Sequence, residues 1–145
     1  MDRYEEKKKF LRGYLYAEQE SKRLMEERQR YIDMATKITS GYRVGGKVMS
    51  GGGQGKIPYA VEKLSELEME IGRAIEKMEE QRREVLNAIR GLENHAQREV
   101  LTRRYINGDK WEKIAEEMNY DYSYVLKLHK SAVKALILKE SIECH

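Results

Sequence analysis

The sequence predicts an all-α protein in which a long N-terminal helical hairpin or coiled coil is followed by a smaller helical domain. Two long stretches carry apolar residues at helical spacing, and the 145-residue chain has one Pro to interrupt them. Charged residues make up 37% of the chain and hydrophobic residues 40%. This balance favours long exposed helices over a large compact core.

The first helix is predicted over residues 2–38. Its apolar residues follow a spacing of seven that only Glu18 interrupts, and further apolar side chains widen the stripe. The residues at this spacing are Tyr4, Leu11, Met25 and Ile32. Such a stripe predicts burial against a partner helix.

The second helix is predicted over residues 58–92, because Pro58 suits a first helical position. A spacing of seven is sustained along it by Leu64, Ile71, Met78, Val85 and Leu92. Neither helix can bury its stripe alone, so we expect residues 1–92 to form an antiparallel hairpin or to pair with another subunit. A single bundle and an oligomer both satisfy the pattern.

The segment between these helices, residues 39–57, holds most of the chain's 11 glycines and several basic residues but no acid. Such a composition predicts a flexible linker, with ordering on DNA phosphate or on a partner as a second role. We reject a phosphate-binding loop at its GGGQGK end. That motif requires Ser or Thr after the lysine and a strand before the loop, whereas Ile57 follows Lys56 and no strand is predicted.

The second predicted domain covers residues 93–145 and begins with a short helix. Asn94 suits the N-cap and Gln97 the partner position of a capping box. The dipeptide Asn107-Gly108 predicts the end of the helix. Apolar residues recur between these limits at Val100, Leu101, Tyr105 and Ile106.

Residues 111–130, WEKIAEEMNYDYSYVLKLHK, match the pattern of a helix-turn-helix. Ile114 and Met118 are placed on the inner face of the first helix, and Ala115 is small enough for the helices to approach closely. Asn119 falls at the turn, where the backbone becomes left-handed and Asn is tolerated. An ordinary amphipathic helix pair with a short turn is the alternative.

The second helix of this unit is expected to close the core with Val125 and Leu128, together with Tyr120 from the turn. Asp121 is expected to cap the helix by accepting from its free N–H groups. His129 is expected on the surface beside the lysines.

The segment from Arg98 to Leu136 resembles region 4 of bacterial sigma-70-type factors. The landmarks are Glu99-Val100-Leu101, Arg104-Tyr105, Gly108, Ile114-Ala115-Glu116, Val125 and the run to Leu136. The whole chain is similar to a family of small phage and prophage proteins that carry a domain of unknown function. These proteins are similar in build to the ArpU and RinA types of phage late-transcription regulators. The bulky Tyr122 and the acidic cap depart from sigma region 4, so its base preference is not carried over. Nothing resembles sigma region 2.

The resemblance implies a phage-type transcriptional regulator that binds double-stranded DNA, with RNA polymerase as a further expected partner. We expect a homodimer with contacts largely in residues 1–92, because the apolar stripes need a partner and one helix-turn-helix reads only a few base pairs. In helix-turn-helix proteins the outer face of the second helix enters the major groove. The candidate DNA-binding residues on that face are Asp121, Tyr122, Ser123, Leu126, Lys127, Lys130 and Lys134. Hydroxyl, carboxylate and ammonium groups can read base edges, and lysines can anchor phosphates. A solvated helix face is the alternative for the lysines.

A small terminase-like DNA-packaging or assembly protein is the alternative function. An enzyme is not expected, because no nucleophile–base pair or spaced carboxylate pair stands out. No cofactor and no metal are expected either, since Cys144 and the three scattered histidines lack zinc-ligand spacing. No stretch reaches the roughly 18 apolar residues of a membrane span. We therefore expect a cytoplasmic, nucleoid-associated protein in the host cell.

Overall fold

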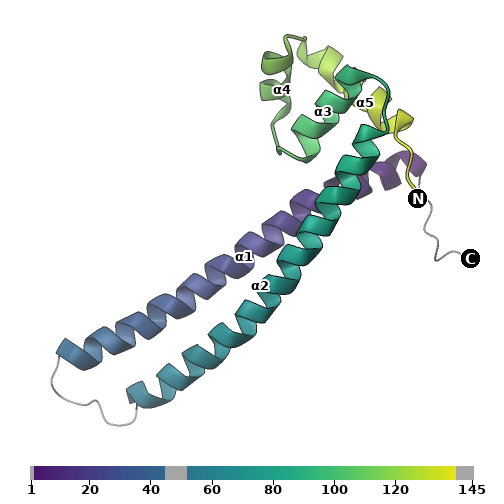
Figure 1. Ribbon diagram of the computed structural model, residues 1–145. Coiled ribbons are helices and arrows are strands. Elements are labelled where there is room, and N and C mark those ends of the chain that lie inside the picture. Colours follow the sequence, from purple (N-terminus) through teal and green to yellow (C-terminus); the bar gives the residue numbers. More distant parts are fainter. Residues whose placement is uncertain (1, 45–51, 140–145) are drawn as a thin grey trace, which may run out of the picture. The chain divides into compact units, whose positions relative to one another are not determined.

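The computed structural model describes the backbone of residues 2–44 and 52–139, and the side chains of residues 2–37 and 58–139. Over the described backbone there are helices and turns but no strand, which confirms the all-α prediction (Figure 1). The elements are α1 (Arg3–Val44), α2 (Gly52–Arg90), α3 (His95–Tyr105), α4 (Trp111–Met118) and α5 (Tyr122–Ala135). No helix in this part of the chain combines the length and the apolar character needed to cross a bilayer.

Both long helices extend further into the glycine-rich segment than predicted. Residues 39–44 continue α1 and residues 52–57 begin α2, so the predicted flexible linker over 39–57 is wrong at both ends. Pro58 consequently lies inside α2 and not at its first position. Adding a residue to an established helix costs little, and glycine makes each addition less favourable by only about 1 kcal/mol. Both helices can therefore continue into the glycine-rich segment. The rest of the predicted linker, residues 45–51, lies outside the described residues.

The chain divides into two compact units. We call Met1–Ala17 together with Met78–His145 the core unit, and Glu18–Lys77 the hairpin unit. Helices α1 and α2 each contribute to both. The predicted division at residues 92 and 93 is therefore not where the packing changes, because the start of α1 and the end of α2 belong with α3, α4 and α5.

The core unit is built around α5, which packs against α3 and α4. Leu11 of α1 and Val85 and Ile89 of α2 enter the same hydrophobic core. The largest fully buried side chains are Leu11, Val85, Ile89, Val100, Leu101, Ile114, Val125, Val133 and Leu136. The predicted domain 93–145 thus shares its core with both long helices.

In the hairpin unit, α1 and α2 run antiparallel. Arg28 of α1 forms an ion pair with Glu68 of α2 at 3.1 Å, and the Tyr31 and Tyr59 rings meet edge to face at 6.3 Å. The later residue of α1 thus contacts the earlier residue of α2, as antiparallel helices require. Among the side chains of this unit that the structure describes, residues 18–37 and 58–77, the buried ones are Ser21, Ala60, Leu67 and Ile71. The predicted α1 stripe is wrong at Met25, which is 41% exposed, because the seam between the helices passes through Ser21.

Candidate nucleic-acid interface

Asn94 starts α3 as predicted. Its backbone is extended (φ −80°, ψ 122°), and its side-chain oxygen accepts from the Gln97 backbone N–H at 2.9 Å. The predicted return bond of a capping box does not form. The Gln97 amide instead donates to the Ser131 hydroxyl of α5 at 3.3 Å. Gln97 therefore links the first turn of α3 to α5.

Gly108 allows the chain to turn between α3 and α4, as predicted. Its φ of 72° is a left-handed conformation that glycine adopts without a steric penalty. A Cβ at this position would lie 3.6 Å from a Leu15 methyl group of α1, so α1 passes close to this turn. The turn directs α4 back across the core.

The turn between α4 and α5 has the predicted left-handed residue at Asn119. Its φ of 59° and ψ of 43° end α4, and the next N–H, that of Tyr120, donates to the Ala115 carbonyl at 3.0 Å. Ala115 is buried, and Ile114 beside it is inaccessible to solvent. The sequence therefore identified the backbone geometry that sets α5 against α4.

Two side chains near this turn lie differently from the prediction. Tyr120 is 39% exposed and packs edge to face on Tyr124 at 4.8 Å, outside the core. Val125 and Leu128, by contrast, are buried as predicted. Asp121 does occupy the N-cap of α5, but its side chain makes no capping hydrogen bond.

Helix α5 divides into a buried and an exposed face. The buried residues are Val125, Leu128, His129, Ala132 and Val133. All seven candidate DNA-binding residues are exposed, on the helix or at its N-cap: Asp121, Tyr122, Ser123, Leu126, Lys127, Lys130 and Lys134. The fold thus brings them together on one element. Tyr124, which was not among the candidates, is exposed on the first turn beside them.

His129 is buried, which corrects the prediction of a surface histidine. It is 6% exposed, its Nε2 lies 2.6 Å from the Tyr105 hydroxyl, and the Trp111 ring meets it edge-on at 4.7 Å. The spacing was informative: His129 stands four residues after Val125 and four before Val133, both of which are buried. His129 therefore adds no side chain to the exposed face.

Burial sets the protonation of this pair. Desolvation, followed by the positive charges of Lys8, Arg104 and Arg12, lowers the pKa of His129 to about 4. Desolvation also raises the pKa of Tyr105 to about 12. The imidazole is thus neutral at pH 7, and its Nε2 can accept a hydrogen bond from the Tyr105 hydroxyl, which keeps its proton. The hydrogen bond between Tyr105 and His129 joins α3 to α5. The two side chains thus help to position the exposed face of α5 but are not part of that face.

Arg104 supports the same cluster from α3. Its guanidinium stacks over the Trp111 ring at 4.2 Å and donates to the Asp109 carbonyl at 3.0 Å. Because Trp111 begins α4 and touches His129 of α5, one stacked group braces three helices.

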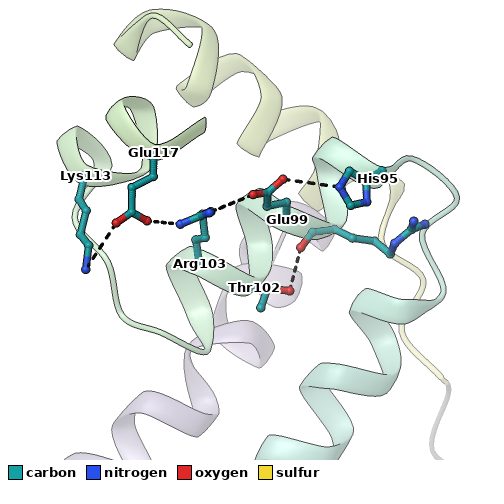
Figure 2. Close-up of polar contacts among 7 residues, drawn as sticks. His95, Glu99, Thr102, Arg103, Lys113 and Glu117 are labelled. Carbon is teal, nitrogen blue, oxygen red and sulfur yellow. Dashed lines mark hydrogen bonds and ion pairs between the residues drawn. The ribbon is translucent and has the colours of Figure 1, made fainter. Parts of the chain in front are cut away.

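A chain of ion pairs joins α3 to α4 (Figure 2). Glu99 contacts His95 at 3.7 Å and Arg103 at 3.0 Å, Arg103 pairs with Glu117, and Glu117 lies 4.0 Å from Lys113. The carboxylate of Glu117 is thereby neutralised within α3 and α4. By contrast, Lys127 and Lys130 form no ion pair with any described residue, so their charges remain available on α5.

One further residue reaches the candidate face from the other end of the chain. The Lys7 ammonium of α1 donates to the Lys134 carbonyl of α5 at 2.9 Å. No local pattern in the sequence indicates this contact, because 127 positions separate the two residues.

Comparison with protein families places the candidate interface inside a recognised domain. A family model described as "Protein of unknown function (DUF1492)" matches residues 37–137. The match takes in all of α2 to α5, and with them the seven candidate residues. No curated protein and no solved structure matches the chain.

Proposed function

This chain belongs to the DUF1492 family, and from that premise we propose that it is a phage-type transcriptional regulator that binds duplex DNA through α4 and α5. The family description names no activity, so the proposal rests on the geometry of residues 111–134. The observation that carries it is the combination of the left-handed turn at Asn119 with an exposed α5 face on which every candidate residue is accessible.

The dimensions and chemistry of α5 suit a major groove. The groove is about 12 Å wide, and a helix with its side chains is about 10–12 Å across. Tyr122 and Ser123 present hydroxyl groups on the first turn, where helix-turn-helix proteins contact base edges. Lys127, one turn further on, can donate to guanine.

The lysines of α5 supply the electrostatic part of the proposed contact. Lys130 and Lys134 are exposed, and no acid follows Asp121 in α5. Phosphate contacts from such lysines contribute affinity that does not depend on sequence. The protein as a whole has a net charge of only +3, so the local arrangement matters more than the total.

A homodimer is part of the proposal. One helix-turn-helix reads only a few base pairs, whereas two copies separated by about one turn of DNA read a longer site. The hairpin unit leaves Met25 and Met69 exposed, and both residues lie within the 1–92 region expected to mediate association. The resemblance to sigma region 4 adds RNA polymerase as a proposed partner at the nucleoid of the host cell.

Selection of bound duplexes from a random pool, using the full chain, tests the proposal. Replacing Tyr122, Ser123 or Lys127 by Ala should relax preference at individual base pairs, by about 1–3 kcal/mol for a good contact. Lys134→Ala should weaken binding to all sequences alike. Lys37→Ala, an exposed lysine in the hairpin unit, is the matched control and should change neither property.

Failure of the full chain to enrich any duplex, or to bind random duplex at low salt, would contradict DNA binding. Native mass distinguishes the proposed regulator from a small terminase-like packaging protein. A dimer agrees with the regulator, whereas a large ring agrees with the packaging protein.

A further inference from the structure

The first turns of α1 are held against the C-terminal end of α5. The Lys134 carbonyl, which accepts from the Lys7 ammonium at 2.9 Å, is one of the last carbonyls of α5 and has no partner within that helix. A cation is favourable at a helix C-terminus, where the partial charge is negative. The contact therefore fixes where the basic start of α1 lies on the core unit.

Two more basic residues of α1 lie close to α5. The positive charges of Lys8 and Arg12 both act on His129 of α5, and that of Arg12 also acts on Tyr105 of α3. The Lys8 ammonium stands over the Tyr4 ring at 5.3 Å and is 3.7 Å from the Glu5 carboxylate. Glu5 is the acid that faces this group, and it neutralises only part of the charge.

The contact at the Lys134 carbonyl brings this part of α1 to the end of α5 that carries Lys130 and Lys134, and Arg12 follows Lys8 by one turn on the same face of α1. Lys130 and Lys134 are exposed on α5, and Lys7, whose ammonium has three donors, uses one of them on the Lys134 carbonyl. Positive charges from two helices are thus brought near one another at this end of α5. Such a cluster repels itself in the free protein and is stabilised by a polyanion.

We propose that Lys7, Lys8 and Arg12 form a phosphate-binding surface for duplex DNA that continues the row made by Lys130 and Lys134. The inference rests on the proposed DNA-binding function and adds α1 to an interface otherwise assigned to residues 111–134. Duplex DNA is favoured over an acidic protein because the surface continues directly from the α5 lysines, and a DNA backbone presents regularly spaced charges along such a row.

The test measures how binding of the full chain to a random-sequence duplex depends on salt. Each phosphate contact contributes about −0.9 to the slope of log K against log salt concentration. The double variant Lys8→Gln with Arg12→Gln keeps the Lys7 contact and should reduce the slope by about 1.8. Conservative replacement by Lys8→Arg with Arg12→Lys should restore it, and Trp111 fluorescence checks that the core unit stays folded.

Lys9→Gln is the matched control. It removes the same charge from the same turn of α1, but Lys9 is exposed whereas Lys7 and Lys8 are partly buried. The slope should stay at the value of the unaltered chain. An equal reduction from Lys9→Gln would overturn the assignment to a defined surface.

The remaining outcomes separate this inference from the proposed function. If the unaltered chain binds no duplex, both fail. If it binds and the slope depends on Lys127 and Lys130 but not on Lys8 and Arg12, the inference alone fails. If the double variant keeps its slope on DNA but loses binding to poly-L-glutamate, the surface belongs to an acidic protein partner and the inference is overturned.

Discussion

The core unit and the hairpin unit share the two long helices but differ in how their apolar side chains are buried. In the core unit, side chains from all five helices meet in one cluster. In the hairpin unit, two helices share one seam with four buried residues among the side chains that the structure describes, and Met25, Val61 and Met69 stay exposed. The two parts of α1 differ in the number of elements against which each packs, and most of a helix's stability in a protein comes from such packing.

This difference predicts unequal local stability. A residue enclosed by several elements opens only when most of the core unit unfolds, whereas a residue on a single seam opens when two helices separate. Substitutions in each unit can measure this contrast.

Leu11→Ala should destabilise the core unit by about 2–5 kcal/mol, because Leu11 is inaccessible to solvent among residues of α2 to α5. Urea unfolding followed by the fluorescence of Trp111, which lies in the core unit, measures the loss. Met25→Ala, at an exposed position of the same helix, should change the stability by no more than about 0.5 kcal/mol. Equal losses from the two variants would show that Leu11 is not enclosed in the core unit as described.

Acid should weaken the core unit through His129. Its pKa is about 4 in the folded protein and about 6.5 when unfolded, so the unfolded chain binds more protons between these values. The stability that neutral His129 contributes to the folded protein is complete above about pH 6.5. It falls as the pH drops through this range and is lost by about pH 4. The two values correspond to about 3 kcal/mol.

Denaturant unfolding at several pH values measures this loss. His129→Gln should remove most of the pH dependence between about 4 and 6.5, whereas His95→Gln, at an exposed position on the first turn of α3, should leave it in place. A full pH dependence in His129→Gln would assign the acid sensitivity to other groups.

Asn119→Gly should leave the stability unchanged or raise it slightly, since glycine adopts the left-handed conformation without a penalty. Asn119→Val should lose about 1–2 kcal/mol. Asn87→Gly, at an exposed helical position in α2, should instead lose a few tenths of a kcal/mol. Thermal unfolding of the three variants gives the comparison, and a clear loss from Asn119→Gly would be inconsistent with this turn.

The smallest effect is expected across the seam of the hairpin unit. Arg28 and Glu68 are 40% and 57% exposed, so a double-mutant cycle with Arg28→Ala and Glu68→Ala should give a coupling of about 0.2–1 kcal/mol. The Arg103–Glu117 pair of the core unit is less exposed and should couple more strongly. A larger value for Arg28 and Glu68 would reverse the ranking of the two units.

Local patterns predicted much of the core unit correctly. Asn94 as a cap, Gly108 and Asn119 as turns, and Ala115 at a close approach each depend on a few neighbouring residues and on the conformations those residues allow. The exposure of the candidate face of α5 follows in the same way from helical periodicity. The binding of DNA by that face stays a prediction.

Other features were not accessible to local patterns. The seam of the hairpin unit runs through Ser21 and not Met25, since the register against α2 decides which side of α1 is covered. Tyr120 lies outside the core against the Tyr124 ring, a contact that the helix-turn-helix pattern does not specify. How much of the glycine-rich segment is helical depends on how far α1 and α2 continue into it, and the composition of the segment does not reveal this.

By itself, the sequence determined the helical class, the turns between the short helices and the exposed face of α5, because spacing and backbone preference act over a few residues. The tertiary structure alone decided that α1 and α2 complete the core around α3 to α5. It also set the neutral His129 against Tyr105 and placed Lys7 at the end of α5. These contacts join residues far apart in the chain, and their free energy appears only once several helices have packed together.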